Sequence, residues 1–432
     1  MQYIRPTLLI ALGLSASVCL LVTHADSTQA SSKPNATIPE AVIQQYTEIA
    51  GVIFTDARDT AEQLQTAVNR LIEEPSEQSL DTARQAWRTA RVPYAQSEVF
   101  RFGNPNVDDW EGQVNAWPLD EGLIDYVATD YVHETGNTGA TANIIATTSL
   151  KVGGQTIDTT KITPEFLRSI HEIGGSEANV ATGYHAIEFL LWGQDLNGIR
   201  AGAGNRPSSD FARGDNCTGG HCERRAMYLK AVTELLVQDL TNMADQWADG
   251  KANYRAEFEQ LPTQEALSRI ITGMGSLSLR ELAGERMRVA LDANSTEDEQ
   301  DCFSDNTHNA HYFNAQGIMN VFNGEYQRDN VHTQGPGIAM LLMQIAPKVN
   351  QQLAKALADT EQKLANMIES AQGKPAMKFD QMVAPGNTQG AAIIQAAIES
   401  LTKQTEVLEQ AAAVIKSATA QSTAKGEEHN NG

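Results

Sequence analysis

The stretch Gly183-Tyr-His-Ala-Ile-Glu-Phe-Leu-Leu-Trp192 sets an imidazole and a carboxylate three residues apart inside an otherwise apolar run. A helix places residues at this spacing on one face. The surrounding apolar side chains follow the spacing of a buried stripe and cover most of the remaining helix surface, which is typical of a helix inside a protein. Because burying an ionised carboxylate costs several kcal/mol unless it is paired or bound to a metal, His185 and Glu188 need a partner from elsewhere in the chain.

The length and charge of the chain limit its organisation and its partners. With 432 residues it exceeds the size at which one hydrophobic core stops growing, so we expect two domains. Its 54 acidic and 32 basic residues give a formal net charge of -22. Binding to nucleic acid or to an anionic membrane needs clustered Lys and Arg, so this composition argues against both. An acidic chain suits cations or a crowded extracytoplasmic space.

The N-terminus has the pattern of a secretory signal peptide. Arg5 supplies a positive charge, an apolar core follows, and Thr23-His-Ala25 offers a small-x-small cleavage site. We therefore assign residues 1–25 to the signal peptide and the Ser-, Thr-, Pro- and Asn-rich residues 26–40 to a flexible leader. Cys19 lies within the apolar core behind a poor residue for lipid attachment, so we expect no lipid anchor. The predicted location is the periplasm or cell envelope.

Three cysteines remain after this cleavage: Cys217, Cys222 and Cys302. In an oxidising compartment two of them should pair and leave one free thiol. A bond between Cys217 and Cys222 would close a tight loop, whereas a bond from either to Cys302 would join distant segments, and the sequence does not choose between them. A soft-metal site built on all three with His221 is an alternative, although exported cysteines are more often structural.

Helical periodicity dominates the mature chain. Apolar residues recur at helical spacing and long strand-like alternation is scarce, which predicts an all-α protein of two helical bundles. The Gly-, Asn-, Pro- and Ser-rich stretch 201–222 is the predicted linker between an N-terminal bundle at 41–200 and a C-terminal bundle at 223–420. A polar tail follows at 421–432. Lys151–Thr156, in a Gly- and Thr-rich region of long loops, is typical of a short hairpin or loop.

Acidic residues on other predicted helices are candidates to face the His185 segment. Glu98 shares a helical stripe with Arg91 and with aromatic residues. Asp120 and Glu121 lie in the first turn of a helix predicted to start at Pro118, where acids also simply complement the helix dipole. One imidazole with several carboxylates is an oxygen-rich ligand set, which favours iron or manganese over a closed structural zinc site.

Hydrolysis is the alternative chemistry. A helical zinc peptidase shows His-Glu-x-x-His or His-x-x-Glu-His, because two imidazoles of one helix hold the ion while Glu activates water. Glu188 would be the catalytic residue of such an enzyme, but Phe189 stands where the inverted motif needs its second histidine. His308 and His311 offer another pair at i and i+3, although beside Asp305 they are more typical of a capped helix start.

Several spaced motifs together resemble the imelysin family, also classed as peptidase family M75, and its iron-regulated protein A-like branch. The family signature Gly-x-His-x-x-Glu is present as Gly183, His185 and Glu188. The further matching stretches are Trp87-Arg88 through Glu98-Val-Phe-Arg-Phe-Gly103, Asn115-Ala-Trp-Pro-Leu-Asp-Glu121, Leu279-Arg-Glu-Leu-Ala-Gly-Glu-Arg286 and Cys302-Phe-Ser-Asp-Asn-Thr-His308. The similarity spans most of the mature chain.

The resemblance implies two four-helix-bundle-like domains related by an ancient duplication, with a site near their interface. At that site His185 and Glu188 are the motif pair, and Glu98 and Asp120 are the other expected metal ligands. The residues expected to line or brace the site are Gly183, Arg91, Tyr94, Trp117 and Glu121.

The function implied by this resemblance leaves three hypotheses. Relatives are exported bacterial proteins, often iron-regulated, and related domains occur in periplasmic ferrous-iron uptake systems. We therefore expect an iron-binding protein of bacterial iron uptake or homeostasis, with zinc as the alternative metal and an envelope iron-transport protein as a partner. The second hypothesis is an M75-type metallopeptidase. The third is a periplasmic module that binds a small ligand or a protein, with His185 and Glu188 only hydrogen-bonded in the core.

Overall fold

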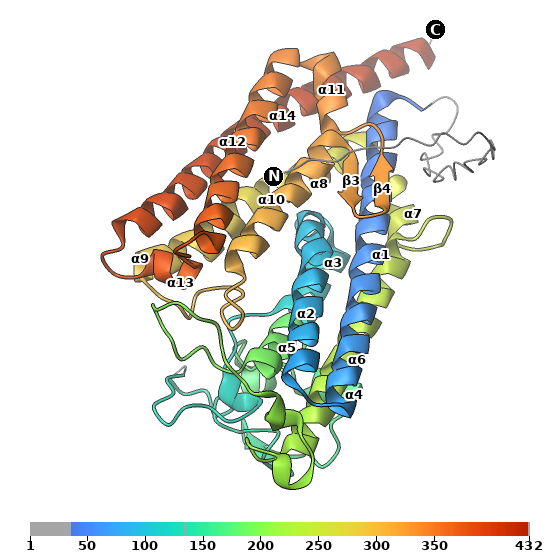
Figure 1. Ribbon diagram of the computed structural model, residues 1–432. Helices are drawn as coiled ribbons and strands as arrows, with labels where there is room; N and C mark the ends of the chain where they lie inside the picture. The colour runs from blue at the N-terminus through green and yellow to red at the C-terminus, as the bar shows by residue number, and fades with distance from the viewer. Residues whose placement is uncertain (1–35, 134, 431–432) are drawn as a thin grey trace, which may run out of the picture.

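The computed structural model describes residues 36–133 and 135–430, with 422–430 as backbone alone. The predicted signal peptide at 1–25 and most of the predicted leader lie outside the described residues. The described chain is predominantly helical, which confirms the all-α class (Figure 1). Within this part of the chain, none of the helices combines the length and the apolar character that a membrane crossing requires.

Long helices alternate along the chain with short ones and with long loops, such as residues 124–148 and 193–207. The α-helices are α1 (Ile38–Glu73), α2 (Glu77–Ser97), α3 (Pro105–Asn115), α4 (Pro164–Ile170), α5 (Gly183–Trp192), α6 (Cys222–Trp247), α7 (Tyr254–Glu259), α8 (Thr263–Gly275), α9 (Val289–Ala293), α10 (Thr307–Asn323), α11 (Ile338–Ile345), α12 (Pro347–Gln372), α13 (Phe379–Val383) and α14 (Thr388–Asn430). The 3-10 helices are η1 (Glu98–Phe100), η2 (Glu121–Leu123), η3 (Ile173–Gly175), η4 (Ser208–Phe211) and η5 (Gly214–Asn216), and η6 (Ser276–Arg288) is a π-helix.

The strands of the described structure form two antiparallel hairpins. One pairs β1 (Ser149–Val152) with β2 (Gln155–Asp158), and the other pairs β3 (Glu325–Arg328) with β4 (Val331–Gln334). The first hairpin lies where the sequence predicted a short hairpin or loop.

Helix α1 begins at Ile38 and thus includes the last three residues of the predicted leader, which ends at residue 40. Thr37 precedes the helix, and its backbone N–H donates to the carboxylate of Glu40 at 2.9 Å. Pro39 occupies the first turn, where its missing N–H leaves no helical bond unmade. Local start signals therefore extend the helix into a stretch whose composition resembles a flexible segment.

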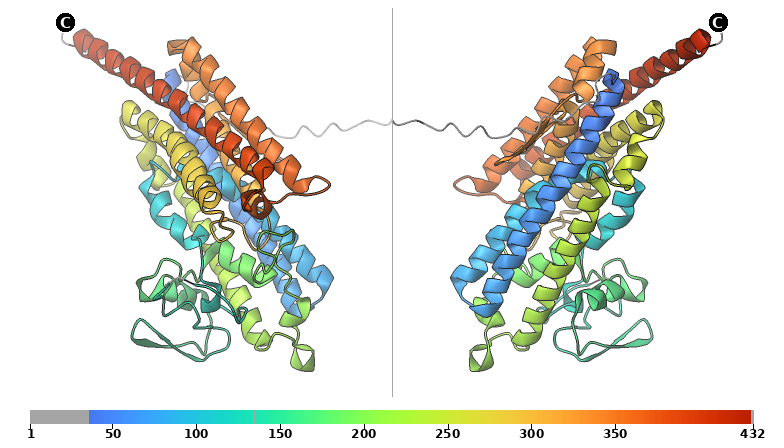
Figure 2. Two further views of the ribbon diagram at one scale, coloured as in Figure 1. Left: turned by 90° about the vertical axis from the view of Figure 1, so that its left-hand side faces the viewer. Right: turned by 90° about the vertical axis from the view of Figure 1, so that its right-hand side faces the viewer.

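The hydrophobic core consists of two clusters that share α1 and α6. The N-terminal half of α1 and the end of α6 pack with α8 and with α10 to α14. The C-terminal half of α1 and the first part of α6 pack with α2 and α5. Figures 1 and 2 show α1, α2 and α6 side by side, with α12 and α14 as a separate layer. The predicted division at 201–222 and the duplication stay predictions, and both clusters use helices from either side of that stretch.

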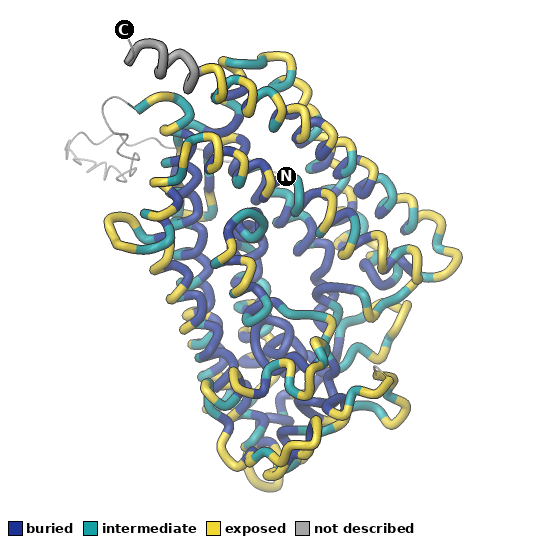
Figure 3. Tube along the Cα trace, turned by 180° about the vertical axis from the view of Figure 1, so that it is seen from behind, coloured by how far each residue is buried: buried dark blue, intermediate teal, exposed yellow. Residues whose placement is uncertain are grey.

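Helix α5 lies inside this core. All of its residues are buried, as its sequence predicted. Figure 3 shows long buried stretches in the interior of the molecule, whereas buried and exposed residues alternate along the outer helices. The His-Glu pair is therefore removed from solvent, as the apolar surround indicated.

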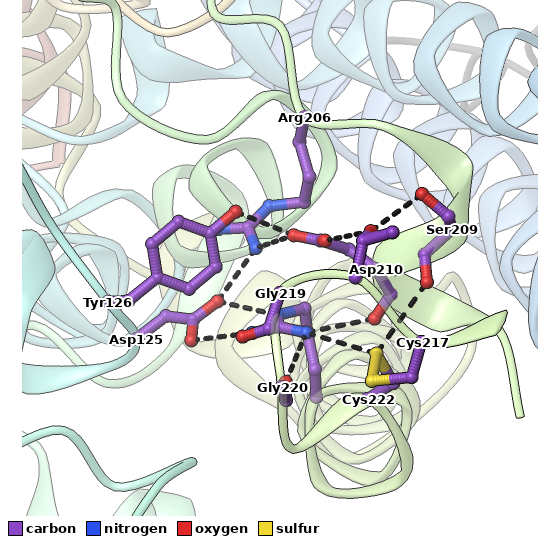
Figure 4. Close-up of a disulfide and its surroundings, with 11 residues drawn as sticks. Asp125, Tyr126, Arg206, Ser209, Asp210, Cys217, Gly219, Gly220 and Cys222 are labelled. Carbon is purple, nitrogen blue, oxygen red and sulfur yellow. Dashed lines mark hydrogen bonds and ion pairs between the residues drawn. A yellow bond between two sulfur atoms is a disulfide. The ribbon is translucent and has the colours of Figure 1, made fainter. Parts of the chain in front are cut away.

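The cysteines adopt one of the arrangements that the sequence left open. Cys217 and Cys222 form a disulfide that closes the loop in front of α6 (Figure 4). Cys302 carries a free thiol. The disulfide therefore joins this loop to the first residue of α6 and does not link it to the segment that contains Cys302.

Two buried arginines share one carboxylate beside this disulfide (Figure 4). Asp125 Oδ2 accepts from Arg206 Nη1 at 2.8 Å and from Arg225 Nε at 2.6 Å. Arg206 also pairs with Asp210 at 3.0 Å. Because buried guanidinium groups need a counter-charge, this network fixes the stretch 201–222 against α6 and the segment after η2. The stretch is a packed part of the structure.

Candidate metal centre

Gly183 determines how closely α5 approaches α3. Its φ of +80° lies in the left-handed region that disfavours residues with a side chain. A Cβ at this position would lie 2.4 Å from the carbonyl oxygen of Val114, next to the last residue of α3. Glycine thus allows His185, in the first turn of α5, to reach Asn115 at the end of α3.

Asp301 completes a group with the predicted pair. One ligand atom each from His185, Glu188 and Asp301 lie within 4.8 Å of one another, and all three residues are buried. Asp301 comes from the loop between α9 and α10. With ligand bonds of about 2.0–2.2 Å, three atoms around one ion can lie up to about 3.8 Å apart, so each ligand atom of this group needs to move by about 0.6 Å at most. One nitrogen and two oxygens are available.

Asn115 fixes the tautomer of His185. Its amide nitrogen donates to Oε1 of Glu98 at 2.8 Å and of Glu111 at 3.0 Å, which sets the direction of the amide. The amide oxygen therefore accepts from His185 Nε2 at 3.2 Å, and the unprotonated Nδ1 faces Glu188 Oε2 at 3.0 Å. A proton on Glu188 satisfies both atoms of this contact.

Burial favours the same arrangement of protons. Desolvation, together with the charge of Asp301, raises the pKa of Glu188 well above its ordinary value of 4.5. Desolvation, and then the nearby Arg91, lowers the pKa of His185 well below 6.5. The second carboxylate oxygen of Glu188 accepts from the backbone N–H of Ser304 at 3.0 Å and from its hydroxyl at 2.7 Å. Both pKa shifts favour a neutral imidazole and a protonated Glu188.

Arg91 holds Asp301 from the other side. Its Nη2 donates to Oδ1 at 2.8 Å and its Nε to Oδ2 at 3.4 Å. The guanidinium lies over the rings of Tyr94 and Tyr184, at 5.4 and 5.2 Å from their centroids. Burial disfavours its charge, but Asp301 and Glu98 outweigh this cost and the pKa of Arg91 is raised. Arg91 and Tyr94, both expected from the sequence to line the site, therefore lie next to Asp301 and α5.

Glu98 lies one residue away from the His185 group. Its Oε1 accepts from Asn115, and its Oε2 accepts from Asn314 at 2.7 Å and from Arg286 of the π-helix η6. Both oxygens are thus occupied, and Glu98 contacts His185 only through Asn115. Its predicted role as a ligand stays a prediction, and in the structure Asp301 takes the third place in the group.

Glu121 begins the short 3-10 helix η2 and Asp120 directly precedes it, where the sequence predicted a longer helix from Pro118. Asp120 is buried, and its carboxylate accepts from Tyr131 at 2.9 Å and from Asn137. Burial raises the pKa of Glu121 to about 7. Trp117 is half-buried at the end of the preceding turn. Neither acid belongs to the three-residue group around His185.

Three residues of the centre were missed by the sequence reasoning. Asn115 and Ser304 lie within the family-like stretches but had no assigned role, and Asp301 directly precedes one of them. Helical spacing relates residues within one helix only, so it could not place the end of α3 or a loop before α10 against α5. The polar run Asp301–His308 was the signal available.

His308 and His311 are buried on α10 without forming a metal group with the centre. Both nitrogens of His311 and Nδ1 of His308 have no hydrogen-bond partner, and the ring of His311 lies 5.1 Å from that of Phe379. Asn306 precedes the helix but makes no side-chain cap bond. Desolvation lowers the pKa of each histidine to about 3. Both imidazoles are therefore neutral in the folded protein.

We expect His311 to destabilise the protein in acid. Its pKa is about 3 when folded and near 6.5 when unfolded, so between these values the unfolded state binds more protons and stability falls as the pH drops below 6.5. At pH 5 the expected loss is about 2 kcal/mol relative to pH 8. Urea unfolding of His311→Leu at both pH values should show that much less pH dependence. His332→Gln, an exposed control, should retain the wild-type difference in unfolding free energy between pH 5 and pH 8. If His311→Leu also retained this difference, the lowered pKa of His311 would not be the cause of the acid sensitivity.

A cavity of about 440 Å³ lies between α2 and α10 beside the centre. Its lining includes Arg88, Arg91 and Asn306. Arg91 and Asn306 both donate to Asp301, the latter through Nδ2 at 2.8 Å. Arg91 and Asn306 therefore line the cavity and also bind Asp301, so a ligand in the cavity would contact the residues that hold this carboxylate.

Comparisons with known proteins agree with the motif analysis. A family model described as imelysin matches residues 50–408. Iron-regulated protein A of Synechococcus elongatus is 30% identical over 122 residues, which are 27% of this chain and 32% of that protein, so the match spans about a third of the relative's length. The crystal structure of a Parabacteroides distasonis protein, described as an iron-regulated protein A precursor, matches with a TM-score of 0.63 at 19% identity, over 90% of this chain and 96% of that one. This last similarity shows a shared fold.

Proposed function

The chain belongs to the imelysin family, and we propose that it is an exported metal-binding protein that takes up iron at His185, Glu188 and Asp301. The observation that carries this proposal is the buried group of one imidazole and two carboxylates whose atoms lie within 4.8 Å of one another. The names of the Synechococcus and Parabacteroides relatives support iron as the metal and iron uptake or homeostasis as the process. A periplasmic location and an envelope iron-transport partner belong to the same proposal.

The donor set fits a divalent transition metal. A neutral imidazole and two carboxylates are ligands that iron(II) and manganese(II) accept, and the set contains no thiolate of the kind that closes structural zinc sites. The unprotonated Nδ1 of His185 faces Glu188, so a cation can take the place of the proton between them. Asn115 and Ser304 hold His185 and Glu188 through the atoms that do not face each other, which preorganises this pair. Both oxygens of Asp301 accept from Arg91 or Asn306, so a metal at this carboxylate would share an oxygen with one of these donors.

Iron titration of the anaerobic, chelator-treated protein tests the proposal. We expect wild type to bind one Fe²⁺ per chain and the double variant His185→Ala, Glu188→Ala to bind at least 100-fold more weakly, because two of three ligands are lost. The matched control replaces His332 and Glu325, an exposed His-Glu pair 3.7 Å apart on the β3–β4 hairpin, by alanine. The proposal fails if both double variants bind iron as wild type does.

One observation favours a second candidate function, a binding module without a metal. Each side chain of the group already has hydrogen-bond partners: Asn115 for His185, Ser304 for Glu188, and Arg91 for Asp301. A protein that used the group only to brace a ligand or partner site would bind Fe²⁺ no better than the alanine double variant. The peptidase hypothesis has less support in the geometry, because Phe189 packs on Phe303 at 5.3 Å in the core.

A further inference from the structure

A second group of acids lies outside the centre. One carboxylate oxygen each from Asp195, Asp305 and Asp380 lie within 4.8 Å of one another. Asp195 follows the end of α5, Asp305 precedes α10, and Asp380 is in the first turn of α13. Three segments that are distant in sequence thus converge on one point.

Asp380 has no partner in this group. It is 1% exposed, and neither of its carboxylate oxygens accepts a hydrogen bond. Oδ1 of Asp305, a residue that is 6% exposed, is likewise unpartnered. Asp195 is better satisfied, since its Oδ1 accepts from the backbone and side-chain nitrogens of Asn197, both at 2.8 Å. Buried polar groups are almost always paired, so two such carboxylates side by side indicate a missing positive ligand.

The described side chains do not supply that positive charge. No lysine or arginine in residues 36–133 or 135–421 forms an ion pair with any of the three carboxylates. Lys378 and Arg88 act on Asp305 from a greater distance. Oε1 of the buried Glu299 is also unpartnered, which adds a further acid to the neighbourhood. Acidic groups therefore outnumber the nearby bases.

We propose that Asp195, Asp305 and Asp380 bind a hard divalent cation of the size of calcium. The donor atoms are all carboxylate oxygens, which hard cations prefer. Three oxygens at calcium–oxygen distances of about 2.3–2.6 Å from one ion can lie up to about 4.5 Å apart. The oxygens of this group lie within 4.8 Å of one another, so they need to move by a few tenths of an ångström at most. Calcium also tolerates irregular geometry and completes its shell with water.

The site would order the loop that serves the iron centre. Asp305 directly follows Ser304, which donates to Glu188, and Asp301 lies in the same loop. A cation bound between this loop, α13 and the end of α5 would join three segments that otherwise repel one another. The two sites remain separate in their ligands, so each can be removed without touching the other.

Calorimetric titration with Ca²⁺ alone, on the chelator-treated full mature chain, tests the inference. We expect one Ca²⁺ per chain and a higher melting temperature in its presence, and Asp380→Asn should weaken binding at least tenfold. Asparagine keeps the shape and removes the buried charge, so this variant should fold at least as well as wild type without Ca²⁺. Asp292→Asn, at an exposed acid on α9, should bind as wild type does.

The iron-site variant separates this inference from the proposed function. His185→Ala, Glu188→Ala should keep full Ca²⁺ affinity, whatever it does to Fe²⁺ binding. Absence of Ca²⁺ binding to wild type at millimolar concentration would overturn the inference, as would unchanged affinity in Asp380→Asn. Loss of Ca²⁺ binding in the iron-site variant alone would place the ion at His185 instead and overturn it too.

Discussion

Asp301→Asn is expected to lower the free energy of unfolding by about 3 kcal/mol, because it leaves the buried Arg91 without its counter-charge. Asp301 and Arg91 are almost wholly inaccessible, and their closest nitrogen–oxygen distance is 2.8 Å. Adding Arg91→Met should restore stability to within about 1 kcal/mol of wild type, since replacing both members of a buried pair by neutral side chains is often nearly neutral. Both variants should bind iron weakly. Urea unfolding of chelator-treated protein and iron titration measure the two effects.

A surface pair provides the control for this experiment. Asp245 and Lys251 approach to 2.6 Å but are more than half exposed, so Asp245→Asn should leave the urea midpoint unchanged. If Asp301→Asn is as mild as this control, Asp301 is not the counter-charge of Arg91. If the double variant recovers stability and also binds iron like wild type, Asp301 has no part in the metal centre.

Gly183→Ala is expected to lower the free energy of unfolding at least as much as Asp301→Asn does. A side chain there meets both a left-handed backbone with φ of +80° and the carbonyl oxygen of Val114 at 2.4 Å. Together these costs predict a loss of about 3 kcal/mol or more, with displacement of the start of α5. Iron affinity should fall as well, because His185 lies two residues further along. Thermal and urea unfolding, combined with iron titration, test this.

The matched control is Gly275→Ala, at a helical glycine whose Cβ would meet no atom within 4 Å. Alanine there should be neutral or stabilise the protein by up to about 1 kcal/mol, as in any open helix position. Equal effects of the two substitutions would show that the approach of α5 to α3 does not depend on Gly183.

The sequence predicted those features of the site that depend on the spacing of residues within a single helix. The apolar surround of His185 and Glu188 predicted a buried helix, and α5 is buried throughout. The same spacing put Glu98 on a stripe with Arg91, but it could not show that Arg286 of a distant π-helix binds Glu98. Residue pairs that meet only through the tertiary fold leave no periodic trace in the sequence.

The features that the sequence did not predict lie in segments without regular secondary structure. Asp301 reaches the centre from a loop, and its place follows from its pairing with Arg91 on α2. Asp120 instead turns to Tyr131 and Asn137, two residues of an aperiodic loop that offered no spacing to interpret. The pairing of the cysteines could not be predicted for the same reason, since the spacing allowed Cys217 to pair with either Cys222 or Cys302.

Helix α1 links the order of synthesis to the order of folding. Its 36 residues span about 54 Å at 1.5 Å per residue, so it runs through both clusters of the core. The half nearest the N-terminus is covered by segments beyond residue 320, as the hydrogen bonds from Gln45 to the Gly324 carbonyl and to the Thr333 hydroxyl show. The first helix of the described chain therefore waits for the segments from α8 to α11 before its surface is covered, and until then a chaperone or an export factor has an extended apolar face to hold.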